Sequence, residues 1–211
     1  MKPWTSSVSW LFGVSVLVAS LGGSLSAQST QSVTLLGIPE NRVALEFVGQ
    51  FNNTPTTSQQ FGYVSRMMGL KIFTSDEVQD ETTAQITFFT DATTDQVRID
   101  GPLKIIDRSG TTTIYLNTPP SDFTNPDSFR QGVPIQISKY RQQVVLNTGT
   151  NSFSTVHMNT IIKTSVFNLN GANYLLGAIG TSFRTAYSGQ SNSDPLGTPS
   201  GWFGGYAVGV N

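Results

Sequence analysis

Alternation of apolar and polar residues, rather than helical spacing, dominates the chain after residue 30. Residues 43–51 show it clearly, with Leu45 and Phe47 on one face and Glu46 and Val48 on the other. A period of two is typical of β-strands that bury one face. No stretch of this region keeps helical spacing over three turns, so we expect an all-β domain.

The same pattern predicts about eight strands, joined mostly by short turns. They span residues 43–51, 61–74, 82–90, 96–107, 111–117, 133–148, 152–169 and 172–188. Turns are expected at 91–95 and 108–110, and Gly101-Pro102 marks an edge, bulge or corner. Nothing suggests crossover helices, so the sheet should be antiparallel. Long strands favour a single closed or nearly closed barrel, with a two-sheet β-sandwich as the alternative.

Asn170-Gly171, between two long β segments, gives the strongest local signal. The pair favours a two-residue type I′ turn, because both central residues of that turn need positive φ. A turn that places Leu169 opposite Ala172 fixes the register of the whole hairpin. The face expected to be buried then holds Met158, Ile162, Val166, Leu175, Ile179 and Phe183, and the opposite face holds His157, Lys163 and Arg184.

The first 27 residues differ from the alternating remainder. Lys2 precedes an apolar stretch at 10–21, two glycines break that stretch, and the small residue Ala27 follows. This is the three-part pattern of a secretory signal peptide, with an apolar helix and cleavage after Ala27. The stretch is too short to span a bilayer comfortably, so no transmembrane domain is expected and the alternative is an uncleaved N-terminal anchor. We expect a secreted or periplasmic protein.

The predicted organisation has three parts: a signal peptide at 1–27, a barrel domain at 28–188 and a Gly-, Ser- and Pro-rich tail at 189–211. The tail carries Trp202, Phe203 and Tyr206. These aromatic residues are candidates to cover a barrel mouth or to mediate self-association with a neighbouring chain.

Composition limits the kinds of ligand and metal site that the chain can form. The chain has 12 Lys and Arg, 13 Asp and Glu, one His and no Cys. Without an excess of positive charge, nucleic-acid binding is not expected. Without Cys, and with one His, neither a disulfide nor a metal site is expected, and no cofactor motif is present. A disulfide-free, Thr-rich exported chain is typical of bacterial secreted proteins. The acidic loop at 76–81 lacks the spacing of a calcium loop and indicates a charged surface.

Four residues are candidates for a ligand site inside the barrel: Glu46, Asp100, Tyr140 and Arg141. Glu46 interrupts a weakly apolar face, and Asp100 lies on another strand. Tyr140 and Arg141 lie where the apolar phase of strand 133–148 switches. A phase switch indicates a β-bulge, and bulges often direct side chains into sites. The alternative for all four is solvent exposure with ion pairs between strands.

The layout is similar to small antiparallel barrels such as the lipocalins and the allene oxide cyclase and dirigent barrels. The resemblance consists of the export signal, the strand number and the Asn-Gly hairpin near the end. It is limited to architecture, since residues 43–51 lack the Gly-x-Trp start of lipocalins and no residue role carries over.

Three functions fit these observations. The first is an exported binding module for a small, largely apolar ligand. The second is a cofactor-free cyclase or isomerase acting in a barrel cavity, which needs a buried carboxylate such as Glu46 or Asp100. The third is a structural or adhesive cell-surface protein that docks through its aromatic tail.

If the signal-peptide prediction is correct, the mature protein begins at Gln28. N-terminal sequencing of the protein recovered outside the cytoplasm measures this directly. A mature chain that starts at Met1 would leave the uncleaved anchor as the better interpretation.

Overall fold

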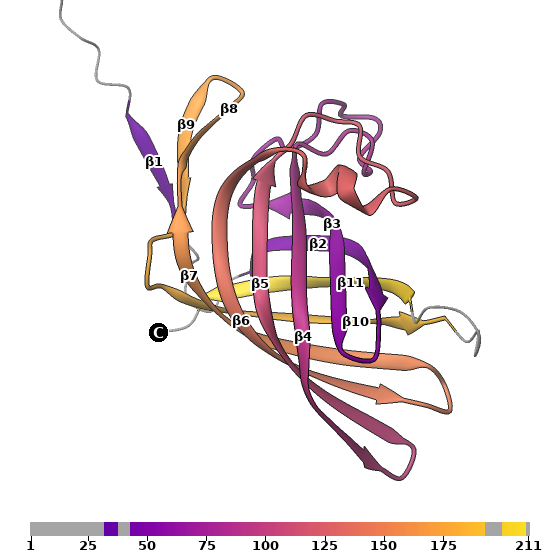
Figure 1. Ribbon diagram of the computed structural model, residues 1–211. Helices are drawn as coiled ribbons and strands as arrows, with labels where there is room; N and C mark the ends of the chain where they lie inside the picture. Colours follow the sequence, from indigo (N-terminus) through magenta and orange to yellow (C-terminus); the bar gives the residue numbers. More distant parts are fainter. Residues whose placement is uncertain (1–31, 38–42, 193–199, 210–211) are drawn as a thin grey trace, which may run out of the picture. The chain divides into compact units, whose positions relative to one another are not determined.

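The computed structural model describes residues 32–37, 43–192 and 200–209, so the predicted signal peptide lies outside the described residues. Eight strands form a closed antiparallel barrel in the order β10-β11-β2-β3-β4-β5-β6-β7, and β7 pairs with β10 to complete the ring (Figure 1). A second, three-stranded sheet has the order β1-β9-β8. The prediction of a single all-β barrel is confirmed.

The strands are β1 Val33–Leu36, β2 Val43–Asn53, β3 Thr57–Met67, β4 Ile86–Asp100, β5 Leu103–Leu116, β6 Val133–Asn147, β7 Ser152–Thr164, β8 Val166–Leu169, β9 Ala172–Leu176, β10 Ser182–Ser191 and β11 Ser200–Gly209. A short 3-10 helix, η1, spans Pro126–Arg130. No helix in the described ranges has the length and apolar character needed to cross a membrane.

Two predicted turns are wrong, because residues 91–95 lie within β4 and residues 108–110 within β5. Each of these segments is paired in the barrel wall, apart from a register shift between Thr94 and Gln96. In residues 91–95 the threonines are β-branched and suit a paired strand, which outweighs the turn tendency of the aspartates. In residues 108–110 the glycine permits close pairing with β4, since a Cβ at Gly110 would lie 2.2 Å from the carbonyl oxygen of Asp91. The turn between β4 and β5 falls instead at Gly101-Pro102, where Gly101 has a φ of +56°.

Residues 200–209 form strand β11, where the sequence suggested a tail. This strand pairs with β10 on one side and with β2 on the other, so the barrel extends to Gly209. Its glycines allow close packing, since a Cβ at Gly201 would lie 2.1 Å from the carbonyl oxygen of Gln190. Phe203 is buried in the same core cluster as the inward side chains of β2. The aromatic residues of this segment therefore belong to a barrel strand.

The type I′ turn at Asn170-Gly171 is confirmed, with φ values of 52° and 85°. The pairs that follow from it hold through β8 and β9, from Leu169 opposite Ala172 to Val166 opposite Leu175. Figure 1 shows this short hairpin continuing from the long strand β7.

Beyond β8 and β9 the predicted register is wrong by one residue. Met158 lies opposite Arg184, and His157 lies opposite Thr185. The ladder is interrupted at Ser165 and over residues 177–181, where Gly177 and Gly180 adopt positive φ. Because of this irregularity, the pairing between β7 and β10 is shifted by one residue from the pairing that the turn would impose. A shift of one residue changes which residues of β10 share a face with a given residue of β7.

The predicted faces change accordingly. Phe183 is buried and Lys163 is exposed, as predicted. His157 is buried inside the barrel and Arg184 is exposed, so the two do not share a face. Contrary to the prediction, Met158, Ile162 and Ile179 are exposed. Val166 is exposed as well, although its pairing with Leu175 is as predicted, so the slip does not account for its placement.

Two apolar clusters stabilise the domain. The larger fills the barrel and extends to Leu36, Phe167, Leu169 and Leu176 of the three-stranded sheet. It contains a group of aromatic rings in edge and tilted contacts, among them Phe47, Phe88, Tyr187 and Phe203. The smaller lies on β3 and β4, where the irregular segment at 117–132 packs with Phe129 fully buried. The irregular segment predicted after β5 is therefore a packed cover for the barrel wall.

Neighbouring isoleucines on β7 test the corrected face. Ile161 is 1% exposed and Ile162 is 41% exposed. We expect Ile161→Ala to lower the free energy of unfolding by about 2–5 kcal/mol, because the change leaves a cavity in the core. Ile162→Ala should cost about 1 kcal/mol or less. Urea unfolding of both variants measures the difference, and a larger loss for Ile162→Ala would contradict the observed register.

Candidate functional site

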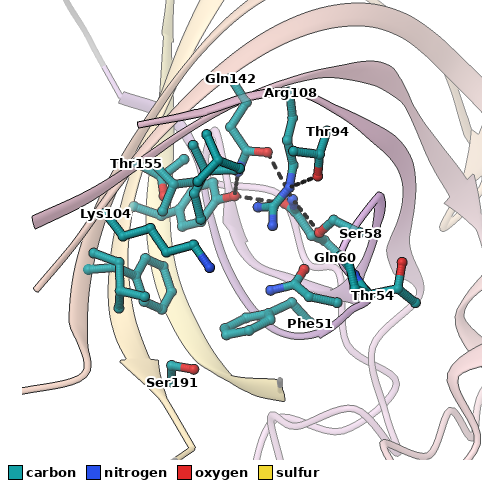
Figure 2. Close-up of a pocket in the computed structure, with 18 residues that line it drawn as sticks. Phe51, Thr54, Ser58, Gln60, Thr94, Lys104, Arg108, Gln142, Thr155 and Ser191 are labelled. Carbon is teal, nitrogen blue, oxygen red and sulfur yellow. Dashed lines mark hydrogen bonds between the residues drawn. The ribbon is translucent and has the colours of Figure 1, made fainter. Parts of the chain in front are cut away.

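One end of the barrel holds a cavity of about 300 Å³ (Figure 2). Exposed residues of the turn between β2 and β3, Thr54 and Pro55, lie at its rim, so the cavity communicates with solvent there. Its apolar lining consists of Phe51, Val97, Ile106, Val144, Leu146 and Phe153. Its polar lining comes from Ser58, Gln60, Thr94, Lys104, Arg108, Gln142, Thr155 and Tyr187, with Asn53 and Ser191 near the rim. Most of these side chains follow from strand alternation, which turns every second residue inward. Val97 is the exception on β4, where the register shifts between Thr94 and Gln96 and so changes which residues face inward.

The inner end of the cavity is closed by a polar layer centred on the Tyr187 hydroxyl. This hydroxyl donates to Gln60 Oε1 at 2.7 Å and accepts from Gln142 Nε2 at 2.6 Å. Gln60 Nε2 in turn donates to Gln142 Oε1 at 3.3 Å. His157 Nε2 lies 3.1 Å from the same hydroxyl. The layer therefore joins β3, β6, β7 and β10 across the interior.

The pattern of these bonds fixes the role of His157. The Tyr187 hydroxyl has one proton, and it is used toward Gln60, so the remaining contact is donated by Nε2–H of a neutral imidazole. Burial, and then the positive charge of Arg108, lower the pKa of His157 to about 3. The ring is therefore uncharged at neutral pH. It also stacks on Tyr140, with ring centroids 4.6 Å apart.

Arg108 is the buried cation of the site, with 6% of its surface exposed. Burial lowers its pKa, but arginine keeps its proton in proteins. Its Nε donates to Thr94 Oγ1 at 3.5 Å, a long contact. Lys104 lies four residues before Arg108 on β5, so the two side chains point to the same side of the strand. Figure 2 shows both cationic groups directed into the cavity. The described lining has no carboxylate to balance them.

A second cavity, of about 60 Å³, lies beyond the polar layer and is surrounded by the aromatic core. It has room for small solvent molecules only. Within the described ranges no three His, Asp or Glu side chains gather as metal ligands would. The open cavity is therefore the candidate site.

Of the four residues predicted from the sequence, only Tyr140 lies inside the barrel, where it is 4% exposed. Glu46 is partly exposed and lies 3.8 Å from Arg66 on the neighbouring strand, an ion pair of the kind that was the alternative. Asp100 is exposed at the end of β4, and Arg141 is exposed on β6. Alternation explains the exposure of Arg141, which follows the inward Tyr140 on β6. Asp100 is exposed because it lies beside the turn into β5.

The β-bulge predicted around Tyr140 is wrong in position, because residues 138–142 of β6 alternate regularly between buried and exposed. The irregularity of β6 lies at Ile135, which is skipped in its pairing with β5, and the register shift toward β7 skips Ile162 of β7. Sequence reasoning missed Arg108, because it was placed in a turn. The available signal was its phase, since Arg108 alternates with the inward residues Ile106 and Ile114. Gln60, Gln142 and Tyr187 were missed because an amide or phenol on a strand gives no sign of facing inward.

Comparison with known proteins finds no matching family model, no similar curated protein and no matching solved structure. The interpretation of the site therefore rests on its own geometry.

His157 gives the protein a pH dependence that can be measured. Its folded-state pKa of about 3 lies below the ordinary value of 6.5, so the unfolded chain takes up the proton first. The contribution of neutral His157 to the free energy of unfolding is fully present above pH 6.5 and decreases as the pH falls toward 3. Between pH 7 and 5 the free energy of unfolding should fall by about 2 kcal/mol.

The chain has one His, so His157→Gln should abolish this loss in the same pH range. Urea unfolding at pH 7, 6 and 5 compares the two proteins. An equal loss in both would show that other groups cause it.

Proposed function

We propose that the protein is an exported binding module that holds a small, largely apolar ligand in the open cavity. One observation carries the proposal: a cavity of about 300 Å³ with six apolar side chains in its lining. Ligand sites are typically concave, mostly apolar and about 300–1,000 Å³ in volume, with a few polar groups that orient the ligand. The interior of an eight-stranded barrel is either filled by side chains or holds one small ligand, and the unfilled cavity favours the second case.

The export part of the proposal is supported by the N-terminal sequence pattern. A secreted or periplasmic binding protein meets its ligand outside the cytoplasm, and the absence of Cys makes its fold independent of the redox conditions there.

The two other functions are less well supported. The cyclase hypothesis needed Glu46 or Asp100 in the cavity, and neither contributes to the described lining. The adhesion hypothesis needed an extended aromatic tail, whereas Phe203 is buried in β11. Self-association through this segment stays a prediction, and on the structure it would involve the half-exposed Trp202 and Tyr206.

A pair of neighbouring variants on β6 tests ligand binding. Val144 is buried and lines the cavity, whereas Val145 lies on the outer face. Val144→Trp fills the cavity, and Val145→Trp adds the same bulk outside. We expect the neutral dye 1-aminoanthracene to bind the unaltered protein saturably with increased fluorescence. Val145→Trp should bind it equally well, and Val144→Trp should not bind it.

Thermal unfolding of both variants checks that each is folded. Native mass spectrometry of the purified protein then shows any co-purified ligand and the number of subunits. Equal dye binding by both folded variants would place the dye outside the cavity and contradict the proposal.

A further inference from the structure

Arg108 is unusual among the arginines of the described chain. Arg66, Arg98 and Arg130 are at least partly exposed, and each lies within 4.0 Å of a carboxylate. Arg141 and Arg184 form no such ion pair with the described residues, but both are exposed to solvent. Arg108 is buried, and no carboxylate of the described residues lies within that distance of it. A buried charge without a partner is strongly unfavourable, because desolvation is not offset by an ion pair.

The groups around Arg108 do not neutralise it. Burial raises the pKa of Tyr140 and of Tyr187, so both phenols keep their protons at neutral pH. The Tyr187 hydroxyl is already bonded within the polar layer. The guanidinium has five N–H donors, and among the described residues its one hydrogen bond is the 3.5 Å contact from Nε to Thr94. Its terminal nitrogens have no hydrogen bond to the described residues, and Figure 2 shows the guanidinium among the side chains that line the cavity.

Lys104 adds a second positive charge on the same side of the site. It alternates with Ile106 and Arg108 on the inward face of β5 and also lines the cavity. The described lining thus combines two cations, no carboxylate and six apolar side chains. A neutral apolar molecule would leave both cations unpaired, whereas an amphipathic acid would match the charged and the apolar parts.

We propose that the ligand is a small carboxylic acid with an apolar chain or ring, whose carboxylate pairs with Arg108 while Lys104 contributes from the rim. The inference rests on the proposed binding function and specifies its ligand class. A planar guanidinium suits a carboxylate because two parallel N–H donors match its two oxygens. The apolar part of the acid would contact Phe51, Val144 and Phe153.

Calorimetric titration with three probes of equal chain length tests the proposal: decanoate, 1-decanol and decylamine. The proteins are the unaltered chain, Arg108→Met, Arg108→Lys and Lys104→Met, each shown to be ligand-free by native mass spectrometry. We expect Arg108→Met to weaken decanoate binding about 10- to 100-fold, the effect of losing a charged hydrogen-bond partner. It should change 1-decanol binding by less than about threefold, because the apolar contacts remain.

The control variants separate charge from shape. Arg108→Lys should retain part of the preference for decanoate, and Lys104→Met should reduce it less than Arg108→Met does. Arg108→Met should not lower the thermal unfolding midpoint, because the change replaces an unpaired buried charge with an apolar side chain of similar length. A marked fall in that midpoint would indicate a structural role for Arg108 and overturn the proposal.

The remaining outcomes distinguish this inference from the proposed function. If decanoate, 1-decanol and decylamine bind the unaltered protein equally well, and Arg108→Met weakens none of them, the carboxylate preference is wrong and the binding function stands. If neither these probes nor 1-aminoanthracene binds, the binding function itself fails.

Discussion

Closure of the sheet is the constraint on which the rest of this structure depends. Each of the eight barrel strands pairs on both sides, so most backbone groups of the wall are bonded to one another. The exception is the end of β4 after Thr94, which pairs with β5 but extends beyond its pairing with β3. Closure also fixes the interior width, and alternate side chains must fill it. Where rings crowd the wall, glycine is needed: a Cβ at Gly62 would lie 3.0 Å from the Phe88 ring and closer still to the backbone of β2.

The interior is filled unequally along the barrel. Aromatic rings pack one end, and the hydrogen-bonded layer around Tyr187 separates them from the open cavity. Gln60, Gln142 and Tyr187 bond to one another and make further contacts with Ser58 and His157, so the layer is stable in the interior. It gives the cavity a rigid polar inner end, while the apolar side chains lie along its walls.

The sequence predicted those features that depend on local chemistry. Alternation predicted the all-β barrel, and Asn170-Gly171 predicted its turn. Features that depend on closure could not be found in this way. Hydrophobic periodicity selected the outer face of β7, because Met158 and Ile162 are more apolar than the inward His157. That inward face is polar because it meets side chains from strands distant in the sequence.

The same limit explains why the candidate site was largely missed. Glu46, Asp100 and Arg141 were candidates for the interior because they are charged residues within predicted strands. Charged residues in strands usually face solvent, and all three lie on or near the outer surface. Glycine-rich β11 gave no strand signal, because its glycines are needed only for contacts with neighbouring strands. Both errors arise where a local preference is overruled by packing across the closed barrel.

The position of Arg108 is hard to explain by stability alone. One residue earlier, Asp107 on the outer face of β5 pairs with Arg98, which shows the ordinary arrangement of charge on this strand. An apolar side chain at position 108 would fill the interior without the desolvation of an unpaired cation. Departures from such local rules are expected at functional sites, where an unfavourable group is retained for what it binds. The unpaired guanidinium lines the larger cavity, which reaches the exposed turn between β2 and β3, and not the small cavity in the aromatic core, and this position supports a role in recognising an anionic ligand.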